Sequence, residues 1–212
     1  MNLSNFNKIL ILGPHTDDGE IGMGGTISRL CREGKEVHYV AFSICEESVP
    51  EQFPKDILSQ EIYGAGEQLG IPAKNIKTLR YKVRKFPSSR QDILEDLVTL
   101  KTQLNPDLVF IPCSFDIHQD HKVIYEEGIR AFKKTSVLGY ELPWNNLEIN
   151  TRCYIKLKEI DIFNKIKAIK SYKSQNFRNY INEDYIRSLA KVRGKQVDLN
   201  LAESFEVIRL IY

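Results

Sequence analysis

The sequence is poor in cysteine and tryptophan, and it has no long apolar run and no strong net charge. Its four cysteines are scattered singly, without a Cys-x-x-Cys pair, so we expect reduced, mostly buried thiols in a cytoplasmic protein. No apolar run is long enough to span a membrane, and the first residues lack the basic and apolar segments of a secretory signal. The formal net charge of +2 indicates no particular partner, and no nucleic-acid recognition module is present.

The apolar residues fall into short runs that alternate with helical patterns. Strands are expected at residues 8–12, 37–42, 76–79, 107–111 and 137–140. Helices are expected at residues 20–32, 56–69, 90–104, 122–132, 159–172 and 183–192. This alternation predicts crossover units and a parallel sheet. A chain of 212 residues that is 42% hydrophobic is enough for one sizeable core, so we expect a single domain.

The first stretch that carries chemistry covers residues 13–26, directly after the apolar run at residues 9–12. It reads as a turn from a buried strand into a helix. The turn carries His15, Asp17 and Asp18, and adjacent carboxylates are costly to bury unless a cation relieves their repulsion. One interpretation is a metal site in which His15 and Asp18 face one ion and Asp17 acts as a base. The other is that an aspartate caps the helix and His15 is an ordinary polar turn residue.

A second cluster follows the apolar run at residues 108–112 and contains Asp116, His118, Asp120 and His121. His118 and His121 are three residues apart, so a helix that begins here would place them on one face. A single histidine near a strand end is usually structural, but two strand-end clusters that each combine histidine and aspartate are harder to explain in that way. The two clusters together predict a metal site.

The glycines of the first stretch raise a rival interpretation. A dinucleotide-binding fold also has a glycine-rich turn after its first strand, but its pattern is Gly-x-Gly-x-x-Gly. Gly22, Gly24 and Gly25 do not have that spacing. The turn of a dinucleotide-binding fold also meets pyrophosphate, whereas this turn begins with two carboxylates. We therefore expect these glycines to allow close backbone packing near the site.

At both clusters the sequence resembles the PIG-L/LmbE-like zinc deacetylases. Their first motif is usually written His-Pro-Asp-Asp-Glu-Glu-Leu-Gly-x-Gly-Gly-Thr, and this chain reads His-Thr-Asp-Asp-Gly-Glu-Ile-Gly-Met-Gly-Gly-Thr from His15. Their second motif resembles residues 116–121, and a weaker C-terminal signature resembles residues 202–205. With the alternating pattern, the resemblance implies an α/β fold: a Rossmann-like three-layer sandwich with a mostly parallel central sheet. It implies one deacetylase domain over residues 1–212.

The resemblance also implies a role for each polar residue. Three residues would hold one Zn²⁺ per chain: His15, Asp18 and His121. Asp17 would be the general base, His118 would stabilise the oxyanion, and Asp120 would orient His118 and favour its protonated form. Three protein ligands leave a coordination position open, which is the catalytic pattern for zinc. The implied reaction removes the N-acetyl group from an N-acetylated amino sugar, a GlcNAc-type glycoconjugate or activated sugar, in surface-polysaccharide assembly.

The substrate is open at this point because two family features are missing. Members that act on small glucosaminides often have an arginine before the second helix and an Asp-Arg pair after the next strand. Here the first arginine is absent, and only Arg84 of the pair remains. The nearest alternative is an N-acetylglucosaminyl-malate-type thiol-precursor deacetylase, which the missing arginine and aspartate disfavour. An alternative of another class is a non-catalytic sugar-binding module on the same fold.

Two further features bear on the substrate. Trp144 and Asn145 follow a predicted strand and form either a sugar-binding loop or an apolar loop plug with a capping asparagine. Residues 165–195 hold nine Lys or Arg and two acidic residues. This segment is either a solvated basic face or an anion site in which Arg178, Arg187 or Arg193 meets phosphate. The expected partner is a small N-acetylated sugar, with a nucleotide- or phosphate-linked form included. The oligomeric state is open, and a homo-oligomer is included among the alternatives.

Overall fold

The computed structural model of the protein describes residues 5–148, 150–176 and 182–211, and its centre is one seven-stranded sheet. The strands are β1 (Lys8–Gly13), β2 (Glu36–Ala41), β3 (Ile76–Thr78), β4 (Leu108–Pro112), β5 (Ser136–Tyr140), β6 (Cys153–Lys156) and β7 (Ala202–Arg209). Their order is β3-β2-β1-β4-β5-β7-β6. The first five pair in parallel, and β7 pairs antiparallel with both β5 and β6. The predicted mostly parallel sheet is therefore confirmed.

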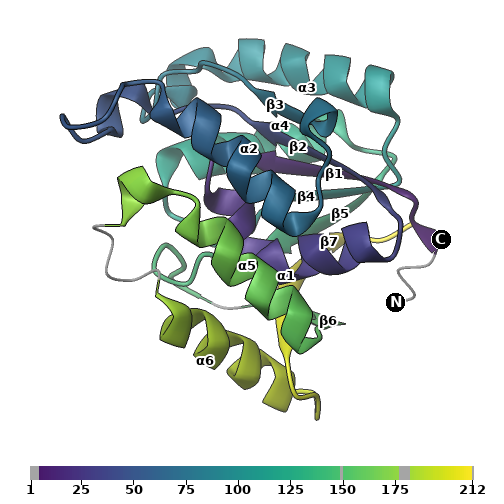
Figure 1. Ribbon diagram of the computed structural model, residues 1–212. Helices are drawn as coiled ribbons and strands as arrows, with labels where there is room; N and C mark the ends of the chain where they lie inside the picture. The colour runs from purple at the N-terminus through teal and green to yellow at the C-terminus, as the bar shows by residue number, and fades with distance from the viewer. Residues whose placement is uncertain (1–4, 149, 177–181, 212) are drawn as a thin grey trace.

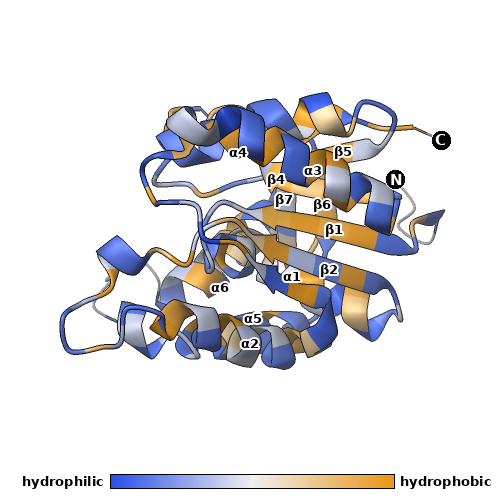
Figure 2. Cartoon of the chain, turned by 90° about the horizontal axis from the view of Figure 1, so that it is seen from above, coloured by the Kyte–Doolittle hydropathy of each residue, from blue (hydrophilic) through white to orange (hydrophobic). Residues whose placement is uncertain are grey.

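Helices cover both faces of the sheet and complete three layers (Figures 1 and 2). The six α-helices of the described residues are α1 (Asp18–Arg32), α2 (Ile57–Leu69), α3 (Arg90–Leu104), α4 (Gln119–Ala131), α5 (Glu159–Lys170) and α6 (Glu183–Lys195). α3 and α4 pack on one face, and the other helices pack on the opposite face, where α5 contacts α1, α2 and α6. Each α-helix lies where the spacing of apolar residues predicts one. No helix among the described residues has the length and apolar character needed to cross a membrane.

The core lies on both faces of the sheet, and β1 shows why its sequence is a continuous apolar run. Ile9 and Ile11 face the helices on one side, while Leu10 and Leu12 face α3 and α4 on the other. All four side chains are fully buried. A strand covered on both faces has no position for a solvated side chain, so the alternating pattern of a half-exposed strand is absent.

The two antiparallel strands were not predicted. β6 has only four residues, and three of them are partly or fully exposed. β7 buries its first four residues, but these include the polar Glu203 and Ser204. Neither strand therefore has an apolar run like those of β1 and β4. All four cysteines are free, as expected, although only Cys45 and Cys113 are buried.

The glycines of α1 allow close packing, as expected. A Cβ atom at Gly22 would lie 2.5 Å from Cδ2 of Tyr140, a distance that real Cβ atoms do not show. The Tyr140 hydroxyl in turn donates a hydrogen bond to the carbonyl of Leu12, at 3.0 Å. The glycine thus lets α1 lie directly against the ends of β1 and β5. These glycines lie within the helix and not in the turn before it, which removes the basis for a dinucleotide-binding turn.

The α1 helix has a kink at Met23, where φ is −147° and ψ is 24°. Just past the kink, the backbone N–H groups of Gly25 and Thr26 donate to the carboxylate of Glu203 on β7, at 3.0 and 2.6 Å. Lys165 on α5 pairs with the same carboxylate at 2.6 Å. The Glu203 carboxylate of β7 therefore caps the second half of α1. It accepts backbone N–H groups there, much as a capping side chain does at the start of a helix.

Candidate functional site

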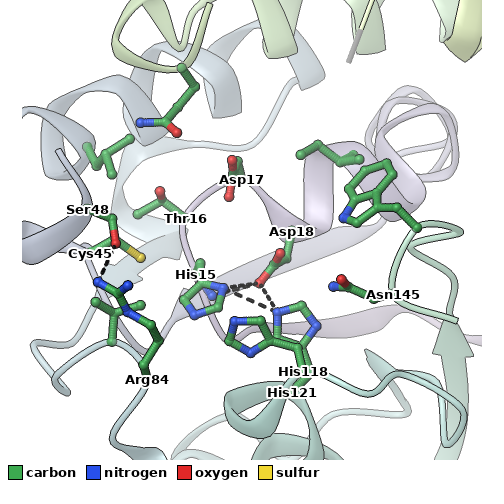
Figure 3. A pocket seen from close by; sticks show the side chains of 15 residues that line it. His15, Thr16, Asp17, Asp18, Cys45, Ser48, Arg84, His118, His121 and Asn145 are labelled. Carbon is green, nitrogen blue, oxygen red and sulfur yellow. Dashed lines mark hydrogen bonds and ion pairs between the residues drawn. The ribbon is translucent and has the colours of Figure 1, made fainter. Parts of the chain in front are cut away.

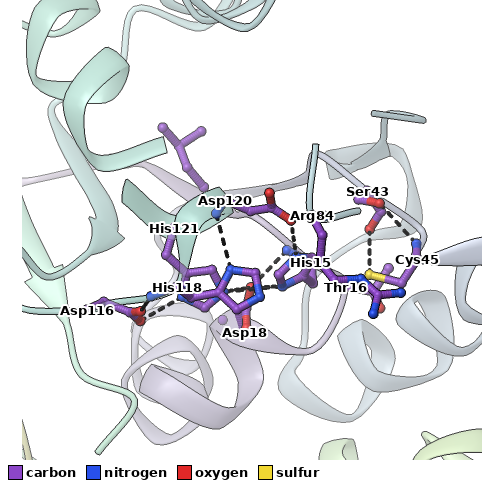
Figure 4. A network of polar contacts seen from close by, with 12 residues as sticks. His15, Thr16, Asp18, Ser43, Cys45, Arg84, Asp116, His118, Asp120 and His121 are labelled. Atoms are coloured by element: carbon purple, nitrogen blue, oxygen red, sulfur yellow. Dashed lines mark hydrogen bonds and ion pairs between the residues drawn. The ribbon is translucent and has the colours of Figure 1, made fainter. Parts of the chain in front are cut away.

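The two predicted polar clusters meet at the carboxyl ends of β1 and β4, which are neighbours in the sheet. His15 lies in the β1–α1 turn and Asp18 begins α1, while His118 precedes α4 and His121 lies in its first turn. From β1 the chain continues to β2, toward one edge of the sheet, and from β4 it continues to β5, toward the opposite edge. This switch point is where open α/β sheets usually bind their ligands. The fold therefore brings together residues that are about a hundred positions apart (Figure 4).

Three side-chain atoms form a nearly equilateral triangle. Nδ1 of His15 lies 3.2 Å from Oδ2 of Asp18, and Nε2 of His121 lies 3.4 Å from the same oxygen. The two ring nitrogens are 3.2 Å apart. A tetrahedral Zn²⁺ ion with bonds of about 2.0–2.1 Å requires ligand atoms about 3.3–3.4 Å apart. These three atoms therefore fit one zinc ion and would leave its fourth position open.

Each of these imidazoles has a buried carboxylate behind it. Nε2 of His15 lies 3.1 Å from Oδ2 of Asp120, and Nδ1 of His121 lies 2.6 Å from Oδ2 of Asp116. Both aspartates are almost completely buried. Metal-binding histidines typically donate their second ring N–H to a carboxylate in this way, which sets the tautomer and the orientation of the ring. Asp116 had no assigned role in the sequence, although it begins the second motif.

Asp120 does not act on His118 as predicted. Its carboxylate meets His15 and also accepts the backbone N–H of Arg84 at 2.6 Å. The link to His118 is instead through the backbone, because the N–H of Asp120 donates to Nδ1 of His118 at 3.2 Å. That contact makes Nδ1 an acceptor, so a neutral His118 ring carries its proton on Nε2. Asp120 therefore orients one metal ligand with its side chain and His118 with its amide.

Asp120 raises the pKa of His118 as expected, but larger effects oppose the protonated form. Burial, followed by the neighbouring imidazoles of His121 and His15, lowers the pKa of His118 to about 4. A divalent cation nearby would lower this pKa further, since it repels a second positive charge. At neutral pH His118 is a neutral imidazole that can donate a hydrogen bond through Nε2.

A second ligand set has to be weighed against the first. Ring nitrogens of His15, His118 and His121 also lie within 4.8 Å of one another. However, Nδ1 of His118 already accepts an amide N–H, and the His118 ring lies against the His121 ring at a centroid separation of 4.5 Å. The set with Asp18 has shorter separations, and its carboxylate offsets part of the ion's charge. The two sets differ only in whether Asp18 or His118 is the third ligand.

Electrostatics in the triangle favour a cation. Burial alone would raise the pKa of Asp18, but His121 and His15 hold it well below its usual range. Burial would lower the pKa of His15, but the neighbouring Cys45, Asp18 and Asp120 raise it well above its usual range. Without metal, the site thus holds a proton between a carboxylate and an imidazole. A metal ion takes the place of such a proton when it binds.

Asp17 faces the same cavity but not the triangle. It precedes the first turn of α1, yet its side chain makes no capping hydrogen bond. It lines the cavity beside Asp18 (Figure 3) and is only 7% exposed. The interpretation that Asp17 is a helix cap is therefore not supported, and its carboxylate is placed next to the position where a metal would lie.

A buried polar unit lies behind the Asp17 loop. The hydroxyl oxygen of Tyr172 lies 2.6 Å from the carbonyl oxygen of Thr16 and 2.8 Å from Oε1 of Glu20. Complete burial raises the pKa of Glu20 to about 8, so this carboxyl is largely protonated at neutral pH. This unit ties the end of α5 to the β1–α1 turn. Neither residue had an assigned role in the sequence, because their contact spans about 150 positions.

The cavity that contains these groups has a volume of about 340 Å³. Its lining residues are His15, Thr16, Asp17, Asp18, Ile21, Cys45, Ser48, Leu58, Val83, Arg84, His118, His121, Trp144, Asn145 and Gln175. All three predicted substrate-binding residues are in this set. The Arg84 backbone has a φ of 63°, in the left-handed region, and its N–H donates to Asp120, so its loop is anchored to the site. Trp144 is 37% exposed.

In the described residues of the basic C-terminal segment, two of the named arginines do not form the anion site that was one of its two interpretations. Arg187 pairs with Glu183 and Glu159, and Arg193 makes two hydrogen bonds to the buried carboxylate of Glu141. Neither arginine lines the cavity, and Arg178 lies outside the described residues. Among the residues shown to line the cavity, Arg84 is the only Lys or Arg.

Comparison with known proteins agrees with this geometry. The model of the PIG-L family, described as GlcNAc-PI de-N-acetylase, matches residues 10–132, which is more than half of the chain. The chain belongs to the PIG-L family. The matched region contains both polar clusters and all of α1 to α3, so the family assignment rests on the part of the chain that builds the triangle.

Curated relatives of this PIG-L protein are deacetylases. An uncharacterized deacetylase, YaiS, of Escherichia coli is 24% identical over 81% of this chain and 95% of its own length. A diacetylchitobiose deacetylase of Thermococcus kodakarensis is 23% identical over 99% of this chain and 86% of its own length. The fold matches that of N,N'-diacetylchitobiose deacetylase from Pyrococcus horikoshii, solved with an inhibitor. The TM-score is 0.80 at 23% identity, and the match covers 97% of this chain and 85% of that one.

Proposed function

We propose that this protein is a zinc-dependent hydrolase that removes the N-acetyl group from an N-acetylated amino sugar. The observation that carries the proposal is the triangle of His15, Asp18 and His121, whose edges of 3.2–3.4 Å fit tetrahedral zinc. The Asp17 carboxylate lines the same cavity. Membership of the PIG-L family and the deacetylase activity named for its relatives support the same reaction.

When bound, zinc makes water available as a nucleophile near neutral pH and polarises the acetyl carbonyl. Asp17 accepts a proton from the attacking water and later delivers it to the amine nitrogen, as the carbon–nitrogen bond breaks. His118, as a neutral ring, donates Nε2–H to the carbonyl oxygen as negative charge develops there. One such donor is typically worth about 3 kcal/mol in the transition state. The products are acetate and the free amino sugar.

The remaining lining residues suit a sugar. Trp144 offers an aromatic face on which a sugar ring can stack, and Asn145 offers both a donor and an acceptor beside it. Arg84 offers only donors and a permanent positive charge. Arg84 is therefore the residue that would bind the phosphate of a nucleotide- or phosphate-linked sugar, in place of the predicted C-terminal arginines.

The deciding experiment is an acetate-release screen with the zinc-loaded protein. Free, nucleotide-linked and lipid-linked N-acetylhexosamines would be compared with an N-acetylglucosaminyl-malate thiol precursor. We expect acetate from at least one amino sugar. Asp17→Asn should keep zinc but lose most of kcat, because an amide cannot accept the proton.

Three outcomes would change the proposal. Acetate from the thiol precursor alone would favour the first alternative function. Sugar binding without acetate from any compound would favour a non-catalytic sugar-binding module. An Asp17→Asn protein with near-normal kcat would show that Asp17 is not the base.

A further inference from the structure

One cavity-lining residue has no role in the proposed chemistry. Gln175 ends the short 3₁₀-helix Lys173–Gln175, which follows α5. It is 6% exposed, and it lines the cavity that also holds Asp17 and Arg84. Its Oε1 atom is buried and has no hydrogen-bond partner among the described residues. An unpaired buried carbonyl costs free energy, so this oxygen needs an explanation.

The neighbouring hydrogen bonds determine which way the Gln175 amide points. The Ser174 hydroxyl donates its only hydrogen to Oε2 of Glu61 at 2.6 Å, while the Ser174 backbone N–H donates to Oε1 of Glu61 at 3.0 Å. The Ser174 oxygen can therefore only accept from the Gln175 amide, and Nε2 of Gln175 does lie 3.2 Å from it. A flipped amide would place two acceptors against each other. Nε2 of Gln175 therefore donates to Ser174, and Oε1 of Gln175 remains available as an acceptor.

Contacts with one helix and with one turn hold this amide in place. Glu61 belongs to α2 and anchors Ser174. Tyr172, three residues before Gln175, is bonded to the Thr16 carbonyl in the β1–α1 turn. The position of Gln175 relative to Asp17 is therefore defined by contacts on both sides, as expected for a group that positions a substrate.

A second unpaired atom supports the same conclusion. The hydroxyl oxygen Oγ1 of Thr16 is buried, lines the same cavity and also has no partner among the described residues. Among the cavity-lining residues that the structure describes, only Thr16 and Gln175 have such an atom. Their elements lie far apart in the sequence, so a shared need for a ligand in this cavity explains both.

We propose that Oε1 of Gln175 accepts a hydrogen bond from one hydroxyl group of the bound sugar and thereby selects substrates that carry this hydroxyl. The inference rests on the proposed function, because it places the sugar in the cavity beside Asp17. The cavity then offers donors from Arg84 and an acceptor from Gln175. A sugar hydroxyl can serve both kinds of partner, whereas an acyl or aromatic group cannot.

The test combines a variant with deoxy substrates. For zinc-loaded wild type and Gln175→Leu, kcat/KM for acetate release is measured with N-acetylglucosamine and its 3-, 4- and 6-deoxy analogues. We expect Gln175→Leu to lower kcat/KM for the complete sugar by about 10–100-fold. For one analogue, wild type and variant should be equal within about twofold, because the hydroxyl that Gln175 binds is already missing. Thr16→Val offers an independent probe of the second unpaired atom.

The controls separate binding from folding. Leucine removes the unpaired buried acceptor and also the Nε2 hydrogen bond to Ser174, and these two changes have opposite effects on stability, so Tm and zinc content of Gln175→Leu should stay close to those of wild type. Gln91→Leu makes the same change on the exposed surface of α3 and should leave all rates unchanged. Rates for Gln175→Leu within twofold of wild type on the complete sugar would overturn the proposal. Equal losses on all three analogues would also overturn it, because no hydroxyl would then be coupled to Gln175.

A binding measurement separates this inference from the proposed function. If wild type releases no acetate, the proposed function fails, and calorimetric affinities of the same four sugars for wild type and Gln175→Leu still test Gln175. Weaker binding of the complete sugar, with no difference for one deoxy analogue, supports the hydroxyl contact. Equal affinities of the two proteins for all four sugars contradict it.

Discussion

At the scale of single residues, four aspartates around one proposed cation site have three kinds of environment. Asp18 lies between two imidazoles, while Asp116 and Asp120 lie behind those imidazoles and are almost completely buried. Asp17 lines the cavity without capping α1. Chemically identical side chains are thus assigned to coordination, ligand orientation and proton transfer by what surrounds each of them.

Because of these environments, we expect substitutions of different residues around the triangle to weaken zinc binding to different degrees. His121→Ala and Asp18→Ala should abolish stoichiometric zinc binding because each removes a corner of the triangle. Asp116→Asn should weaken zinc binding by roughly 10–100-fold, because the His121 ring loses its orienting carboxylate. Competition with a chromophoric chelator measures these affinities, and Asp92→Asn on the exposed part of α3 is the matched control. Loss of zinc in His118→Ala with normal zinc in Asp18→Ala would favour the three-histidine set instead.

Because the positively charged Arg84 lines the cavity, we expect a preference for anionic substrates. Arg84→Ala should lower kcat/KM for a phosphate-linked N-acetyl sugar more than for the free sugar, since the variant loses the only Lys or Arg among the described residues that line the cavity. Added salt should reduce this preference in the wild type, because it screens the attraction. Lys82→Ala removes the same charge from a nearby exposed residue that pairs with Glu47 and should have little effect. Equal kcat/KM values for the free and phosphate-linked sugars in the wild type would show that no phosphate is recognised.

At the scale of elements, the C-terminal strand β7 supports the helix that carries the proposed metal ligand Asp18. Glu203 caps two N–H groups beyond the kink of α1 and pairs with Lys165 of α5. Both charged side chains are buried. This contact gives a physical reason for the weak C-terminal signature at residues 202–205, which lies far in sequence from the motif it supports.

We expect a large loss of stability when the contact between Glu203 and Lys165 is broken. Glu203→Gln should lower the free energy of unfolding by about 3–5 kcal/mol, because it leaves Lys165 as a buried charge without a partner. Adding Lys165→Met should recover much of this loss. Denaturant unfolding measures both changes, and Glu33→Gln, which breaks the exposed pair with Arg29, should cost less than about 1 kcal/mol. An equal effect of Glu203→Gln and Glu33→Gln would show that the buried contact contributes little.

At the scale of the whole molecule, the proposed zinc ion links two loops about a hundred residues apart, and Asp120 connects them to the Arg84 loop. Because zinc binds the folded site and not the unfolded chain, it should stabilise the native state. At a free zinc concentration of 100 times Kd, this amounts to about 2.7 kcal/mol. For a chain of 212 residues, removal of zinc by a chelator should lower Tm by roughly 5–11 °C.

This thermal prediction has an internal control. Asp18→Ala should have the same Tm with buffered zinc and with the chelator, because the binding site has lost one corner. A wild-type Tm that is unaffected by zinc would contradict the metal assignment. A zinc-dependent shift that persists in Asp18→Ala would show that the metal binds elsewhere.

Most of the secondary structure and the members of the polar clusters could be predicted from the sequence. β1 and β4 are apolar over most of their length because both faces of the sheet are covered there, and α1, α2 and α3 end close to Gly34, Gly70 and Pro106. The metal triangle could be named because its residues lie in two short motifs, each just after such a strand. These are local properties, set by the size, polarity and backbone preference of neighbouring residues.

Only the tertiary structure decided which of these residues meet. Asp120 turns to His15 and not to His118, and the arginines expected to bind phosphate pair with glutamates instead. The capping of α1 by β7 and the unpaired oxygen of Gln175 also have no local signal. Each depends on distances between side chains that lie far apart in the chain. The local pattern sets which groups are available, whereas the packing of the layers sets their partners and hence their charge and chemistry.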